Sequence, residues 1–135
     1  MSRMKQLLVV VVLIMVALGL GFAWGASGRM TLQHGLEDAQ QQLDLSDARG
    51  RVLDARVSLY NVNFGDAQRQ LEDAKAPLTR ARDRAQSEGK KEAADALSTA
   101  LTHVQDAQRL ASRLDQAANS QAGEALKAIQ AASTK

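Results

Sequence analysis

The sequence predicts an all-α protein with a single N-terminal transmembrane helix, an antiparallel three-helix bundle and a short fourth C-terminal helix. Three observations lead to this fold class. Residues 7–26 are an uncharged apolar run, the rest of the chain repeats apolar residues at steps of three and four, and short turn-like segments divide that repeat. We expect residues 1–6 to be a cytoplasmic stub, 27–30 a hinge and 31–135 an extracytoplasmic bundle.

Residues 7–26 contain no charge, amide or proline. A helix of this length extends for about 30 Å, which matches the hydrocarbon thickness of a bilayer. We therefore expect a transmembrane helix whose first partner is the lipid bilayer. Trp24, near its outer end, is suited to an interfacial anchor.

The charges on either side of this run predict its orientation. Arg3 and Lys5 precede it, whereas Glu37 and Asp38 follow it. The positive-inside rule then places the N-terminus in the cytoplasm and the remaining domain in the periplasm or an equivalent space. The predicted location is the inner (cytoplasmic) membrane, crossed once.

A cleaved signal peptide is the alternative interpretation. Ala23 and Gly25 supply small residues at the −3 and −1 positions of a cleavage site. Because the apolar run is longer than the usual signal core, we favour an uncleaved anchor.

Small residues recur along one face of the predicted membrane helix. Ala17, Gly21 and Gly25 are spaced by four, and residues four apart share a helical face. Such a face lets a second helix approach closely, so we expect helix packing there. The frequency of glycine in membrane helices in general is the competing explanation.

Composition excludes several classes of function. The chain has no cysteine, which removes disulfides, thiolate metal sites and covalent c-type haem. Without Arg3, Lys5 and Arg29, 14 of the 17 Lys and Arg residues remain, against 15 Asp and Glu. This balance provides no basic surface of the kind that binds nucleic acid.

The segment from about Met30 to Tyr60 carries two apolar stripes. The first stripe comprises Leu36, Ala39, Leu43, Ser46, Gly50, Leu53, Val57, Tyr60 and Phe64, and the second comprises Leu45, Ala48, Val52, Ala55, Leu59 and Val62. The two stripes are adjacent on a helix, so together they predict a face wide enough to contact two neighbours in a bundle.

Turn signals define the remaining helices. Residues 61–66 predict a turn with Asp66 as the helix cap, and the apolar spacing through Pro77 favours one kinked helix. Gly89 predicts a helix end within 87–91. A heptad from Ala93 to Ala118 predicts the next helix, and 121–132 the short last one, capped by Asn119 or Ser120.

Residues suited to catalysis, metal binding or cofactor binding are not found in any recognisable pattern. The two histidines, His34 and His103, lack the Glu-x-x-His spacing of di-iron bundles, and they are better explained as surface residues than as haem ligands. The arginines at 80, 82 and 84 point to different sides of a helix, which favours a solvated face. We therefore predict no catalytic residue, metal or cofactor.

Tyr60 and Phe64 lie at the corner of the first hairpin. The sequence favours a core position for both, with contact to a partner as the alternative, because the domain is poor in aromatic residues.

These features predict a non-enzymatic, membrane-anchored accessory subunit. It would bind or stabilise a larger membrane complex, such as a respiratory, photosynthetic or transport assembly, through its transmembrane helix and its extracytoplasmic domain. Self-association is compatible with the same pattern. The alternative is a freestanding periplasmic bundle that binds a small apolar ligand or haem.

Overall fold

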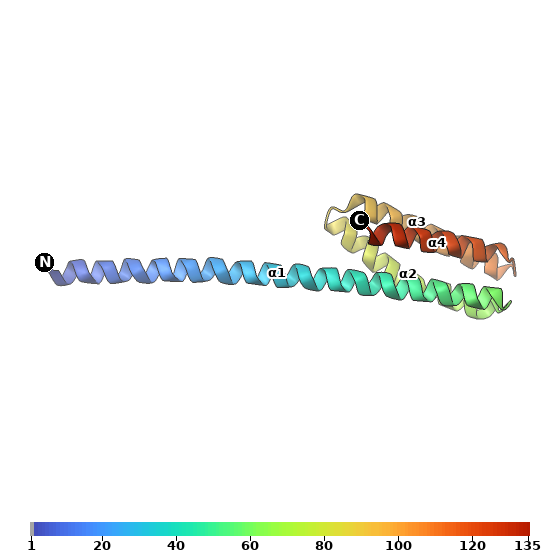
Figure 1. The fold of residues 1–135 in the computed structure, drawn as a ribbon, viewed down its shortest axis with the longest axis horizontal. Coiled ribbons are helices and arrows are strands. Elements are labelled where there is room, and N and C mark those ends of the chain that lie inside the picture. Colours follow the sequence, from blue (N-terminus) through green and yellow to red (C-terminus); the bar gives the residue numbers. More distant parts are fainter. Residues whose placement is uncertain (1) are drawn as a thin grey trace. The chain divides into compact units, whose positions relative to one another are not determined.

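The computed structural model describes residues 2–135, with the backbone alone described for residues 2, 23, 24, 26 and 27. Within that range the chain forms four α-helices and no strand, which confirms the all-α prediction (Figure 1). The helices are α1 (Ser2–Tyr60), α2 (Phe64–Ser87), α3 (Lys91–Ser112) and α4 (Ala117–Ser133). The predicted anchoring role of the Trp24 side chain falls outside the described residues.

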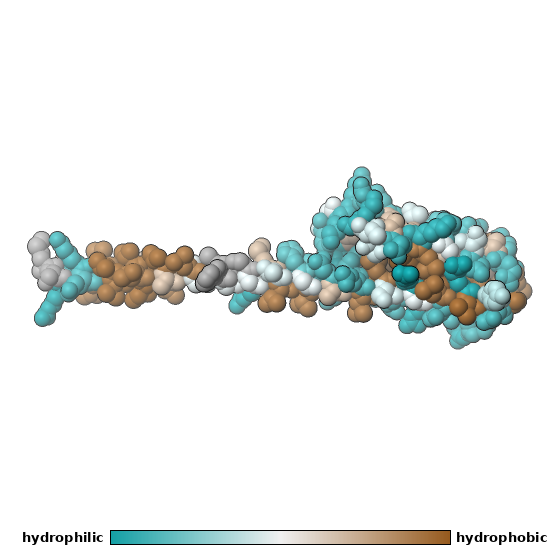
Figure 2. All heavy atoms as spheres, in the orientation of Figure 1, coloured by the Kyte–Doolittle hydropathy of each residue, from teal (hydrophilic) through white to brown (hydrophobic). Residues whose placement is uncertain are grey.

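The chain divides into two units, Met1–Ala39 and Gln40–Lys135. In the first unit, Arg3–Phe22 has a mean hydropathy of 2.4 and is 0% buried, so it is long and apolar enough to span a membrane. Figure 2 shows this segment as a band of hydrophobic side chains. The backbone stays helical through residues 27–30, where we predicted a hinge, so any movement there stays a prediction.

The second unit is a helical bundle with one core. Helices α2 and α3 pack together, as do α3 and α4, and residues 40–60 of α1 complete the core. Most of its buried residues are alanines, interspersed with a few larger side chains. The largest fully buried side chains are Leu59, Leu71, Leu78, Leu97, Val52 and Val104. Alanine allows helix backbones to approach closely, so this core is narrow.

The α1–α2 turn falls where the sequence predicted it, but its cap is Asn63. The Asn63 side chain accepts a hydrogen bond from the Asp66 backbone N–H at 3.2 Å. Asp66, which we predicted as the cap, lies in the first helical turn, where a negative charge is favoured by the helix dipole. Val62, predicted to be inward, adopts φ 59° in the turn and is exposed.

The next turn confirms the expected boundary between α2 and α3. Helix α2 continues through Pro77 as a single helix, as predicted, and the kink at Pro77 stays a prediction. It ends at Ser87, Gly89 follows in the left-handed conformation with φ 72°, and the Lys90 N–H donates to the Ala85 carbonyl at 2.9 Å. This arrangement is typical of a glycine-terminated helix.

The α3–α4 boundary differs from the prediction. Helix α3 ends at Ser112 rather than near Ala118, and α4 begins before the predicted residue 121. Leu114 adopts φ 57°, and the Asp115 N–H bonds to the Leu110 carbonyl at 3.0 Å. The Asp115 side chain then accepts from the Ala117 N–H at 2.9 Å. The N-cap residue of α4 is Gln116, and the Asp115 carboxylate satisfies the Ala117 N–H, so the predicted caps Asn119 and Ser120 lie inside the helix.

Candidate interaction surface

The two apolar stripes of α1 have opposite environments. Almost all of the second stripe is buried in the bundle core, at Leu45, Ala48, Val52, Ala55 and Leu59. The first stripe, which we expected to pack against a second neighbour, is mostly exposed. Small and polar residues interrupt the first stripe, whereas the buried part of the second is uniformly apolar. The second stripe therefore belongs to the bundle core, and most of the first stripe faces solvent.

The exposed part of the first stripe within the bundle unit forms the outer face of α1. We define this face by Leu43, Ser46, Gly50, Leu53, Val57 and Tyr60. Leu43 is 70% exposed, Val57 60% and Tyr60 81%, although each belongs to a repeat of apolar residues at helical spacing. Hydrophobic side chains reach the surface of the bundle among hydrophilic ones in Figure 2. An apolar strip at helical spacing that no neighbour covers is typical of an interaction site.

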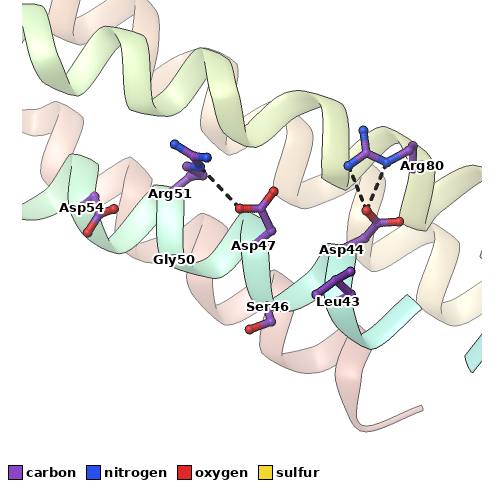
Figure 3. Close-up of a pocket in the computed structure, with 8 residues that line it drawn as sticks. All are labelled: Leu43, Asp44, Ser46, Asp47, Gly50, Arg51, Asp54 and Arg80. Carbon is purple, nitrogen blue, oxygen red and sulfur yellow. Dashed lines mark hydrogen bonds and ion pairs between the residues drawn. The ribbon is translucent and has the colours of Figure 1, made fainter. Parts of the chain in front are cut away.

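A groove runs along this face beside two small residues. Its lining includes Leu43, Ser46 and Gly50 together with Asp47 and Asp54. In Figure 3, Ser46 points away from α2, whereas the Asp44 side chain turns toward it. A Cβ added at Gly50 would meet nothing within 4 Å, so packing inside this chain does not require glycine there.

Charges of opposite sign border the outer face. Asp47 and Asp54 lie on one border, while Arg49 and Arg56 lie on the other, next to α4. Arg49 donates to Gln130 at 3.4 Å, and Arg56 donates to Asn119 at 2.8 Å. Asp54 makes no hydrogen bond or ion pair with any described residue. Asp47 is paired with Arg51 at 3.4 Å, and all four charged side chains are exposed to solvent.

Asp44, behind this face, is the buried carboxylate that holds α1 to α2. It is 8% exposed and accepts hydrogen bonds from Arg80 at 3.0 and 2.9 Å and from Arg84 at 3.0 Å. Arg84 also donates to Gln41 at 2.8 Å. A buried carboxylate needs such partners, because burial without them is costly.

The arginine cluster is therefore only partly the solvated face that we predicted. Arg82 pairs with its neighbour Asp83 on the surface, whereas Arg80 and Arg84 bind across to α1. The sequence signal for this was the four-residue spacing of Arg80 and Arg84, which places both on one face of α2.

The two aromatic residues at the hairpin corner are separated by the fold. Phe64 is 8% exposed and belongs to the core, as the sequence favoured. Tyr60 is exposed at the end of the outer face, so the core prediction is wrong for this residue. Only Tyr60 keeps the geometry of a partner contact.

The small residues of the apolar segment are open as well. Ala17, Gly21 and Gly25 are exposed along α1, and a Cβ at either glycine would meet nothing within 4 Å. Their role in helix packing stays a prediction.

Neither histidine is among the residues that define the outer face. His103 on α3 is hydrogen-bonded through Nδ1 to the Gln121 side chain at 2.8 Å, and His34 lies 3.8 Å from Glu37. Within residues 2–135, no group of three or more His, Asp and Glu side chains is arranged to hold a metal ion. The outer face of α1 is an exposed apolar strip bordered by charged side chains.

No protein-family model, curated protein or solved structure matches this chain.

Proposed function

We propose that this chain is a non-enzymatic, membrane-anchored structural subunit that binds a partner protein through the outer face of α1. The observation that carries the proposal is the exposure of Leu43, Val57 and Tyr60 on one side of a helix whose other side is buried. Exposed apolar residues at this spacing cost solubility unless a partner covers them. Contact by a helix would bury them most completely.

In this proposal, residues 7–26 cross the cytoplasmic membrane once with the amino end inside. The predicted bundle, of three helices and a short fourth, then lies in the periplasm or an equivalent compartment. The apolar composition of Arg3–Phe22 supports the membrane span. Arg3 and Lys5 support the orientation through the positive-inside rule.

A test of membrane insertion comes first. The full chain is expressed in a bacterium with two membranes, and intact mass and protease access are measured on membranes and spheroplasts. The proposal expects an uncleaved chain whose bundle is digested only from the periplasmic side. A chain that loses its first 25 or so residues would show the signal-peptide alternative to be correct.

A matched pair of variants tests the binding role. Leu43→Ser removes an exposed leucine from the outer face, and Leu114→Ser removes an equally exposed leucine from the α3–α4 turn. The proposal expects native mass spectrometry in mild detergent to show a protein complex that only Leu43→Ser weakens. Equal behaviour of the two variants would count against the outer face.

A further inference from the structure

The outer face of α1 follows the heptad repeat of a coiled coil. With Leu43 at position a, the face places Leu43, Gly50 and Val57 at a positions. The intervening Ser46, Leu53 and Tyr60 then fall at d positions. These are the positions that two-stranded coiled coils use for their contact, and Val57 at a with Leu53 at d suits a two-stranded one.

The bordering charges fall at the positions that select the partner. In this register, Asp47 and Asp54 occupy e positions, and Arg49 and Arg56 occupy g positions. In a parallel coiled coil, each g residue lies beside the e residue of the next heptad on the other helix. Arg49 of one copy would then meet Asp54 of a second copy, and the symmetric pair would form as well.

The same charges oppose an antiparallel arrangement. Antiparallel helices place g beside g and e beside e, so arginine would face arginine and aspartate would face aspartate. Such like-charge contacts are unfavourable. A parallel arrangement is also the one available to two copies anchored in one membrane with the same orientation.

We infer that a second copy of this chain occupies the outer face of α1, forming a parallel two-stranded coiled coil with Arg49–Asp54 ion pairs between copies. This inference rests on the proposed role of the outer face as a docking surface. Ser46 and Gly50 lie where the two helices would come closest. Their small size, which nothing within the chain requires at Gly50, lets the helix backbones approach.

Cysteine crosslinking of the full chain in detergent tests the geometry, because the natural sequence contains no cysteine. Ser46→Cys and Val57→Cys lie on the outer face, and Gln105→Cys is an exposed control on α3. The two face positions are separated by about 16 Å along the helix. A parallel dimer in register brings identical residues together at both, whereas an antiparallel one can do so at only one.

We expect both face variants to form disulfide-linked dimers at least about tenfold more than Gln105→Cys under mild oxidation. Crosslinking at only one face position, or at neither above the control, overturns the inference. Circular dichroism of each reduced variant confirms that the helices are intact, so that a folding defect is not mistaken for a missing contact.

Charge reversal tests the ion pairs. Arg49→Glu or Asp54→Arg alone would weaken the dimer by about tenfold, because two attractive pairs become repulsive. The double variant R49E/D54R would restore dimerisation. The double variant also lacks the Arg49–Gln130 hydrogen bond. If Arg49 acted only through that bond, the double variant would not dimerise. Failure of R49E/D54R to restore dimerisation therefore overturns the inference.

The failures of the two proposals are distinguishable. If the chain binds a different protein through Leu43 but gives no specific crosslinks, the docking role of the outer face stands and the proposed homodimer is wrong. If neither crosslinking nor partner binding depends on the outer face, both proposals are wrong.

Discussion

Leu43 and Asp44 are neighbours in the sequence with inverted exposure, since the leucine is 70% exposed and the aspartate 8%. The two exposures differ because α2 lies beside Asp44 and supplies hydrogen-bond donors to it, but does not cover Leu43. Arg80 and Arg84 satisfy the Asp44 carboxylate, whereas no described residue covers the Leu43 side chain. The ion pairs of Asp44 with α2 therefore lie directly beside the first residue of the outer face.

Removing the buried carboxylate should destabilise the bundle. We expect Asp44→Ala to lower the free energy of unfolding by about 1–3 kcal/mol, because the largely buried Arg84 loses its carboxylate partner and keeps only the neutral Gln41 acceptor. The matched change Asp47→Ala removes an exposed carboxylate paired to Arg51 at 3.4 Å, and should cost less than about 0.5 kcal/mol. Urea unfolding followed by circular dichroism measures both. Equal losses would show that Asp44 does not bear this role.

The two stripes of α1 should respond differently to the same substitution. Val52 is fully buried and Val57 is exposed, so Val52→Ala should cost about 1.5–3 kcal/mol of unfolding free energy, and Val57→Ala less than about 0.5. The measurement belongs at protein concentrations where the chain is monomeric, since Val57 also lies on the outer face. A larger effect at Val57 than at Val52 would reverse the assignment of the core.

Replacement by alanine should lower the stability of the bundle at Gly89 and raise it at Gly50. Gly89 adopts φ 72°, so Gly89→Ala should lower stability by about 1–2 kcal/mol. Gly50 is helical with open space around a new Cβ, so Gly50→Ala should raise monomer stability by about 0.5–1 kcal/mol. Thermal unfolding of both variants provides the comparison. A destabilised Gly50→Ala monomer would indicate packing at that point within the chain.

Acidification should remove a surface contribution to stability. The pKa of Glu72 is lowered by hydrogen bonds from Lys75 and Gln108, and the pKa of Glu92 is lowered by its hydrogen bond from Lys135. A lowered folded-state pKa means that the contribution is present above the ordinary value of 4.5 and is lost as pH falls through the folded-state pKa. We expect the melting temperature of Glu72→Gln to fall less than that of the natural chain between about pH 6 and pH 3. Parallel pH profiles would contradict this.

Substitution of the glycines in the apolar segment should affect association in detergent according to the helical face on which each glycine lies. Gly21 shares a face with Ala17 and Gly25, whereas Gly19 lies on nearly the opposite side. We expect Gly21→Ile to weaken association in detergent by severalfold and Gly19→Ile to have little effect, as measured by sedimentation. Loss of association in both variants, or in neither, would argue against the Ala17–Gly21–Gly25 face.

The sequence predicts where the helices lie more accurately than where they end or which of their faces other helices cover. The repeat through Pro77 and the glycine at 89 were sufficient to place α2 and its end. At Leu114 the heptad continues in phase, and no glycine or proline marks the break, so the apolar repeat does not reveal the turn. Whether the first or second stripe of α1 is buried depends on where α2 and α4 pack, and local spacing does not contain that information.

The site was predictable in its parts but not in its arrangement. Leu43, Gly50 and Tyr60 were recognised as members of an apolar stripe, yet their exposure follows from packing on the other side of the helix. The pairing of Asp44 with Arg80 and Arg84 spans 36 and 40 residues of sequence. Such a contact cannot be obtained from helical periodicity alone, because periodicity relates residues within one helix only.

The alanine-rich core restricts how this sequence can change over evolutionary time. A leucine in a protein interior can be exchanged for a smaller residue and later regained, but an alanine packed between helix backbones can scarcely be exchanged for anything bulkier. Enlarging a position such as Ala100 or Ala107 would push two helices apart, at a cost of about 1–3 kcal/mol. Relatives that keep this bundle should therefore conserve small side chains inside it while their exposed faces diverge freely.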